Sequence, residues 1–309
     1  MNFAGAQSAT ADAADSLLRA NLAHGEAVLA SIRPVLRRLV ANADHAMFSE
    51  EAVARTRGLI ESLAWRLVRQ AGGGMADAAA LAPAEALIGA LAAQPDLLAH
   101  CHALVVEGQL GERLEREARI DPVLPPLLQA QITSAAADPA AIAMALFAAQ
   151  ARFVQGFRRM EITPGELPAD LLHGVLAAFV QTCGSEAERV AGEIRAEFDE
   201  ARSRLALLGR VALGLGDSFD LALEPDQAGI ALFVTALALM AGQERDAVVL
   251  ATTDGQQARL ALLMAIAGLA PAAAEAVLLK LHPDATIPRH CLGVSREQAE
   301  TLLMAGGGA

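Results

Sequence analysis

The chain has 309 residues with a formal net charge of −12, and 54% of them are hydrophobic while only 3% are aromatic. Ala and Leu dominate the apolar residues and favour helix, whereas the aromatic and β-branched runs typical of strands are missing. We therefore predict an all-α protein built from antiparallel helical hairpins. The negative charge should repel nucleic acids and anionic lipids, which makes both unfavourable partners.

The cysteines and the N-terminus indicate where the protein works. Cys101, Cys183 and Cys291 are widely separated and odd in number, which predicts reduced thiols and a cytoplasmic location. Residues 1–14 show no signal peptide and are expected to be disordered. The uncharged run at 227–243 is at the low edge of spanning length and lacks basic anchors, so we predict a buried helix and no membrane span.

The first predicted subdomain covers residues 15–120. A helix is expected over 15–41, kinked at Pro34 because proline lacks a backbone donor. A second helix begins after Ser49, a plausible N-cap, and the glycines at 72–74 end it. Further helices are expected over 75–93, 95–106 and 111–120.

The strongest turn signals in the chain follow, at Asp121-Pro122 and Pro125-Pro126. We place a boundary there, so that residues 121–309 form a C-terminal helical-repeat-like subdomain. Asp138 before a proline predicts the N-cap of a long helix. The charged segment from Ser185 to about Leu213 is predicted to be one helix with a broad solvated face. A short turn at 163–166 and a helix over 169–182 are expected between them.

The C-terminal part repeats a pattern of helix, glycine turn and helix at an offset of 25 positions. In each copy the glycine stands where the end of a helix needs a left-handed residue. One such hairpin cannot bury its apolar face alone, so neighbouring hairpins are expected to stack. A looser third copy surrounds Gly242. The matched pairs are Gly268 with Gly293, Ala274 with Ala299, Glu275 with Glu300, Leu278 with Leu303, and, with a mild substitution, Val277 with Leu302.

Three segments of this region carry a family resemblance: Thr235-Ala236-Leu237-Ala238, Ala247-Val248-Val249-Leu250, and residues 260–269. They resemble the C-terminal half of an uncharacterised bacterial all-helical family, a domain of unknown function whose helical pairs are similar to HEAT repeats. The resemblance covers the C-terminal part only and transfers no catalytic residue. It implies an irregular HEAT-like stack or multi-helix bundle, and a non-enzymatic role.

His100, Cys101 and His102 are the densest set of potential metal ligands. Consecutive residues of a helix point about 100° apart, so the two histidines diverge by about 200° and cannot share a metal. Zinc would need an extended backbone here and two more ligands from elsewhere. We therefore predict no metal site, and a histidine pair beside a buried thiol.

A second group comprises His282, Asp284, His290 and Cys291. A cysteine nucleophile needs a nearby base, and residues adjacent in sequence, such as His290 and Cys291, usually point apart; His282 could approach across the loop. The sequence shows no oxyanion donor, glycine-rich phosphate cradle or positioned carboxylate pair beside them. We therefore predict no catalytic residue, no cofactor and no enzymatic activity.

The segment 291–299 looks like the turn and recognition helix of a helix-turn-helix, in which Arg296 and Gln298 would read DNA. The same helix carries Glu297 and Glu300, and no basic flank follows to contact phosphates. Our preferred interpretation is a cytosolic helical scaffold that binds an unknown protein partner, and a homo-oligomer is compatible with it. The alternative is a transcriptional regulator that binds DNA through this C-terminal hairpin.

Overall fold

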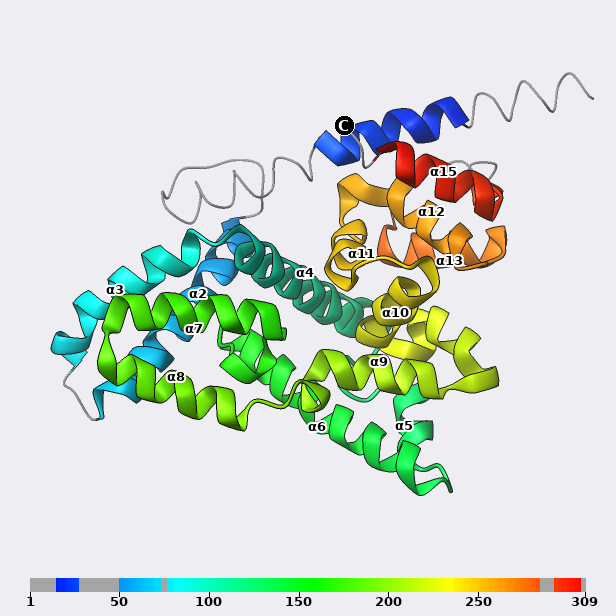
Figure 1. Ribbon diagram of the computed structural model, residues 1–309. Coiled ribbons are helices and arrows are strands. Elements are labelled where there is room, and N and C mark those ends of the chain that lie inside the picture. The colour runs from blue at the N-terminus through cyan, green and yellow to red at the C-terminus, as the bar shows by residue number, and fades with distance from the viewer. Residues whose placement is uncertain (1–14, 28–49, 74–76, 284–291, 307–309) are drawn as a thin grey trace, which may run out of the picture.

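The computed structural model describes residues 15–27, 50–73, 77–283 and 292–306. All regular elements in these ranges are helices, which confirms the all-α prediction (Figure 1). After a helix over 15–27 the elements, with η for a 3-10 helix, are α2 (Glu50–Gly72), α3 (Asp77–Ala92), α4 (Pro95–Ala118), α5 (Pro126–Ile132), α6 (Ala137–Arg158), η1 (Pro164–Glu166), α7 (Ala169–Cys183), α8 (Ser185–Glu197), η2 (Glu200–Arg202), α9 (Arg204–Gly214), η3 (Gly216–Leu223), α10 (Pro225–Ala241), α11 (Arg245–Ala251), η4 (Asp254–Gln256), α12 (Gln257–Ile266), α13 (Pro271–Leu281) and α15 (Arg296–Gly306).

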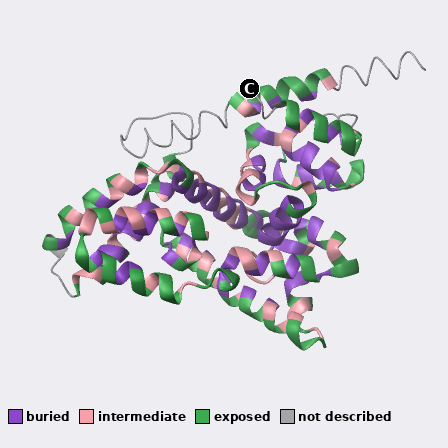
Figure 2. Ribbon diagram, viewed as in Figure 1, coloured by how far each residue is buried: buried purple, intermediate pink, exposed green. Residues whose placement is uncertain are grey.

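Helix α4 is the central element, and its buried surface runs through the middle of the molecule (Figure 2). Its first half packs with α2, α3, α7 and α8 around the fully buried Phe179. Its second half packs with α5, α6 and α9 to α13 around Phe233. A third, smaller core joins the helix at 15–27 to α12 and α15. Because α4 supplies both large cores, the two halves of the fold share one rigid axis.

Helices from both sides of residue 121 contribute to the two large cores. Helices α7 and α8 lie after this position in the sequence, yet they pack on α3 and α2. Helix α6 places Phe157 in the first core and Leu146 in the second. The predicted boundary at residues 120–121 coincides with a loop in which Asp121 Oδ1 accepts bonds from two backbone N–H groups. The division into subdomains itself stays a prediction.

The prediction of separate helices over 95–106 and 111–120 was wrong, because α4 is continuous. Gly108 in this region serves packing and does not break the helix. A Cβ atom on Gly108 would lie only 2.5 to 2.6 Å from three ring carbons of Phe157. Glycine therefore lets α6 approach α4 closely, and the helix tolerates its low propensity at this position.

The single helix predicted from Ser185 to Leu213 was also wrong: α8 and α9 are separate helices joined by η2. Two polar side chains offer the backbone another set of hydrogen bonds. Asp199 Oδ1 accepts from the N–H of Ala201, and Ser203 Oγ accepts from the N–H of Ala206. The break lets α9 start in a new direction, with its first residue, Arg204, buried.

Several other sequence predictions can be compared directly. The ends of α2, α3 and α7 agree with the predicted ones within two residues, and the turn at 163–166 is η1. The uncharged run at 227–243 forms α10, which is buried almost throughout. Asp138 is not the N-cap of α6, because the helix begins at Ala137 and Ala136 caps it. Residues 1–14, 28–41 with Pro34, and Ser49 lie outside the described residues.

The glycine repeat is supported at the positions that the structure describes. Gly242 and Gly268 have φ angles of 62° and 84°, the left-handed conformation that the pattern predicted. Ala274 and Ala299, matched between the two copies, are both buried, and the same is true of Val277 and Leu302. These matched positions are therefore buried in both copies, although the first copy packs in the second core and the other copy in the third, smaller core. The conformation of Gly293 stays a prediction.

By length and composition, helix α6 could cross a membrane, and so could η3 with α10 if the two helices, bent by 98°, are counted as one span. A buried core helix passes the same test, and α10 is buried almost throughout. Only 33% of the most apolar 18-residue stretch of α6 is buried. The helix therefore presents an uncharged surface over residues 139–151.

Two glycines of α4 provide a test of this packing. Replacing Gly108 by alanine is expected to destabilise the protein by about 1 to 3 kcal/mol, because the ring of Phe157 must move. Gly111→Ala is the matched control, since its Cβ would meet nothing closer than 3.6 Å. It should be neutral or stabilising by up to about 1 kcal/mol through helix propensity. Urea unfolding followed by circular dichroism measures both, and equal effects would contradict the packing role of Gly108.

Candidate functional site

A buried carboxylate held by two arginines lies at the centre of the fold. Arg204 Nη1 and Nη2 donate to the two Glu107 oxygens at 2.7 and 3.0 Å. Arg245 does the same at 2.8 and 2.9 Å. The side chains of Glu107 and Arg204 are only 1% and 2% exposed, and that of Arg245 is 13% exposed. Both arginines bind in the bidentate geometry that gives the strongest charge-assisted hydrogen bonds.

Further contacts tie this cluster to neighbouring helices. Arg204 also donates to Gln150 Oε1 at 3.2 Å, and its guanidinium lies 3.7 Å from the ring centroid of Phe153. Arg245 Nε donates to Thr235 Oγ1 at 2.9 Å. Side chains of α4, α6, α9, α10 and α11 therefore meet in one network. We name Glu107, Arg204 and Arg245, with Gln150 and Thr235, the central ion cluster.

Electrostatics keep Glu107 ionised. Burial alone would raise the pKa of Glu107, but the charges and hydrogen bonds of Arg204 and Arg245 together outweigh burial and hold that pKa far below its usual range. The carboxylate is therefore an anion at any physiological pH. A group with such a low pKa is a poor proton donor or acceptor, so the central ion cluster is a structural element rather than an acid or base.

An open groove with a volume of about 540 Å³ lies beside this cluster, between α4, α7, α9 and α11. Leucines of the last three helices form its apolar part, among them Leu171. Arg245 lines it as well, although its guanidinium is directed to Glu107. We call it the acidic groove, because four carboxylates line it: Asp96, Asp170, Glu244 and Asp246.

The three residues of the predicted histidine–cysteine set have different surroundings. His100 lines the acidic groove and donates from Nδ1 to Asp246 Oδ2 at 2.6 Å. Cys101 lies in the first core, where burial and the nearby Asp246 charge raise its pKa to about 12. His102 is buried as well, and burial lowers its pKa to about 4. At neutral pH, Cys101 is therefore an inert thiol and His102 a neutral imidazole.

Only part of the second predicted group lies in the described residues. His282 is buried at the end of α13, and its Nδ1 donates to Asp254 Oδ1 at 2.8 Å. Burial lowers the pKa of His282, which Asp254 opposes. Asp284, His290 and Cys291 lie outside the described residues. Among the described residues, no cluster of His, Cys, Asp and Glu side chains has the arrangement of a metal site.

The predicted DNA-reading residues lie on α15 and make contacts within that helix. Arg296 Nε donates to Glu300 Oε1 at 2.9 Å, and the arginine side chain is 60% exposed. Gln298 Oε1 accepts from the N–H of Ser295, while Ser295 Oγ accepts from the N–H of Gln298. This reciprocal pair is a capping box that starts α15. Both residues therefore have a structural role in the free protein.

The sequence interpretation missed the central ion cluster. Glu107 is the only charged residue between Asp96 and Glu112, in an otherwise apolar stretch of α4. Such an isolated charge on a buried helix must find a partner, which is the one available signal. Its partners are 97 and 138 positions away, so the sequence alone does not identify them.

Comparisons of the chain with protein-family models, with curated proteins and with solved structures gave no match.

We expect a single substitution in the central ion cluster to lower the free energy of unfolding strongly. Glu107→Gln keeps the shape but removes the charge, which leaves the buried guanidinium of Arg204 and the partly buried one of Arg245 without a counter-ion, and should cost about 3 to 5 kcal/mol. Glu115→Gln is the control, since Glu115 is 46% exposed and its ion pair with Arg158 is worth less than about 1 kcal/mol. Urea unfolding at pH 7 measures both variants. Equal losses would show that Glu107 does not organise the core.

We expect the free energy of unfolding to depend on pH because of His102. Its pKa falls from 6.5 in the unfolded chain to about 4 in the fold, so between these values only the unfolded state binds the proton. The stability that the neutral imidazole contributes is present above pH 6.5 and is lost as pH falls towards 4, by about 3 kcal/mol. The measurement is urea unfolding from pH 7 to pH 4, with His102→Gln as the reference. If the free energy of unfolding of His102→Gln depended on pH as steeply as that of the unsubstituted protein, His102 would not be the residue responsible.

Proposed function

We propose that the protein is a non-enzymatic cytosolic helical scaffold that binds a protein partner, with the acidic groove as the docking site for a basic segment of that partner. The observation that supports the proposal most is the composition of the groove, which combines carboxylates with leucines in an open cavity of about 540 Å³. Such a surface suits an extended or helical peptide that carries Lys or Arg among apolar residues.

The charges of the groove favour a cationic ligand. Of its four carboxylates, Asp246 is engaged by His100, while the one guanidinium that lines the groove, from Arg245, is engaged by Glu107. The net charge of the whole chain is −12, which adds a long-range attraction for basic partners. The aliphatic stems of Lys and Arg would pack on leucines such as Leu171 while their charged ends reach Asp170 or Glu244.

The groove is formed before any partner arrives. Its wall at α11 begins at Arg245, which the bidentate contacts to Glu107 hold in place. Glu244 and Asp246 flank this arginine in the sequence, so the central ion cluster fixes the backbone that presents both carboxylates. A preformed surface loses little conformational entropy on binding, which favours recognition of a flexible segment.

Binding accounts for the groove better than catalysis does. His100 and Asp246 form a hydrogen-bonded pair that could orient an imidazole, but the Nε2 atom of His100 is buried and makes no hydrogen bond to a described residue. The neighbouring thiol of Cys101, with a pKa of about 12, stays protonated at neutral pH. A nucleophile needs a deprotonated or base-activated group, and this pair does not provide one.

Site-specific photo-crosslinking in cells tests the proposal. A benzophenone amino acid at Leu171, inside the groove, should capture a protein through a segment rich in Lys or Arg. The same amino acid at Leu279, which is 46% exposed on α13, should not capture it. Reversing two groove charges with Asp170→Lys and Glu244→Lys should abolish the crosslink, because like charges then face the basic segment.

The matched control for this charge reversal is Glu186→Lys with Glu188→Lys on α8, which changes the net charge equally outside the groove. A crosslink that survives reversal in the groove, or that is lost equally in the control, would contradict the proposal. Salt-sensitive binding of duplex DNA that Arg296→Ala abolishes would instead favour the transcriptional regulator; we expect no duplex binding tighter than about 10 µM at physiological salt.

A further inference from the structure

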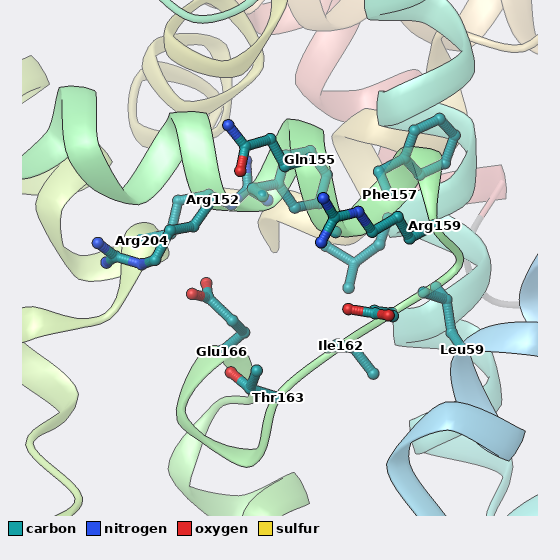
Figure 3. A pocket seen from close by; sticks show the side chains of 13 residues that line it. Leu59, Arg152, Gln155, Phe157, Arg159, Ile162, Thr163, Glu166 and Arg204 are labelled. Atoms are coloured by element: carbon teal, nitrogen blue, oxygen red, sulfur yellow. The ribbon is translucent and has the colours of Figure 1, made fainter. Parts of the chain in front are cut away.

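A second and more enclosed cavity borders the central ion cluster at Arg204 (Figure 3). It has a volume of about 190 Å³ and is formed by α2, α4, the end of α6, the following loop, η1 and the start of α9. An apolar cavity of about 150 Å³ holds one benzene molecule. This space therefore accommodates a ligand with a few more non-hydrogen atoms than benzene. We call it the small-ligand cavity.

One side of the small-ligand cavity carries a negative charge without a partner. The side chain of Glu166 reaches from η1 into the cavity (Figure 3). Its Oε2 atom is buried and accepts no hydrogen bond, and Glu166 forms no ion pair with any described residue. A buried oxygen in this condition costs free energy, which a ligand N–H or ammonium group would recover. The carboxylate therefore favours a ligand that carries a hydrogen-bond donor, such as an N–H or an ammonium group.

The opposite side carries positive charge. Arg152 and Arg159 extend from α6 and from the residue after it, and Figure 3 shows Arg159 across the cavity from Glu166. Neither guanidinium forms an ion pair or a side-chain hydrogen bond within the described residues. The third arginine of the cavity, Arg204, is already neutralised by Glu107. Two exposed guanidinium groups therefore remain for an anionic group of a ligand, and a carboxylate is an anion that arginine binds with two parallel hydrogen bonds.

Apolar side chains form the buried part of the wall. Gln155, Glu161 and Thr163 also line the cavity but are exposed, and the Glu161 carboxylate pairs with Arg66 at 3.9 Å. Leu59, Leu104, Phe157 and Ile162 line the cavity, and all four are buried in the first core. A ligand with an ammonium and a carboxylate group would therefore need an aliphatic or aromatic portion to fill the remaining space. The combination excludes a simple anion, which would face Glu166, and a simple cation, which would face the arginines.

We propose that the small-ligand cavity binds a free α-amino acid with an apolar side chain, with the ammonium group on Glu166, the carboxylate on Arg152 and Arg159, and the side chain against Leu59 and Ile162. This site is separate from the acidic groove. It gives the scaffold a small-molecule ligand in addition to its protein partner.

Isothermal titration calorimetry with L-leucine as the probe tests the site. L-Leucine should bind with a Kd below about 1 mM. Two analogues each lack one charge: leucinamide has no carboxylate and 4-methylpentanoate has no ammonium group. Each analogue should bind about tenfold more weakly or worse, because one charged side of the cavity is then left without its partner.

Variants separate the two charged sides. Glu166→Gln should weaken L-leucine binding about tenfold or more, and the double variant Arg152→Gln with Arg159→Gln should do the same. The controls are Arg158→Gln and Glu115→Gln, an exposed ion pair outside the cavity whose loss should leave the Kd unchanged. Circular dichroism establishes that each variant is folded.

Three results would overturn the proposal. The first is the absence of binding heat for L-leucine, L-valine, L-methionine and L-phenylalanine at concentrations near 10 mM, about ten times the expected limit of Kd. The second is equal affinity for L-leucine and 4-methylpentanoate, which would mean that Glu166 contributes nothing. The third is unchanged affinity in folded Glu166→Gln protein. None of these results bears on the acidic groove, so the two proposals fail independently.

Discussion

The buried carboxylate of Glu107 is the constraint on which the rest of the structure depends. A single charge in an apolar interior is costly, and the fold compensates with four hydrogen bonds from two guanidinium groups. Because each bond has a narrow range of distance and angle, the starts of α9 and α11 are fixed relative to α4. Apolar contacts between Ala and Leu side chains are less directional. The ion cluster thus supplies geometry, while the two large cores supply most of the stabilisation.

The same cluster also positions both candidate sites. Arg204 lines the small-ligand cavity and Arg245 lines the acidic groove, and each donates two hydrogen bonds to Glu107. Neither arginine is free to bind a ligand, so what they contribute to the sites is the placement of their neighbours. In the groove these neighbours are Glu244 and Asp246. The two cavities are therefore linked through one centre, because each is bordered by one of the two arginines that bind the same carboxylate.

The sequence predicted the features that depend on residues close together in the chain. Composition predicted the helices, and the glycine pattern predicted the left-handed turn at Gly268. The sequence failed where a residue's role is set by a distant partner. Separate helices were predicted over 95–106 and 111–120 because the contact that explains Gly108, with the ring of Phe157, involves a residue 49 positions away, on α6. For the same reason neither cavity could be predicted, since each is assembled from helices that are far apart in the chain.

The arrangement of charges around Arg245 explains how a chain so rich in Ala and Leu can specify one packing. Helices with similar apolar faces can slide or rotate against each other at little cost. In α11, however, Arg245 stands between Glu244 and Asp246. Rotating or shifting the start of α11 by one residue would bring a carboxylate toward Glu107, so an attraction between opposite charges would become a repulsion between like charges in a buried site. The acids that give the groove its charge therefore also disfavour the wrong alignment of the helix that carries them.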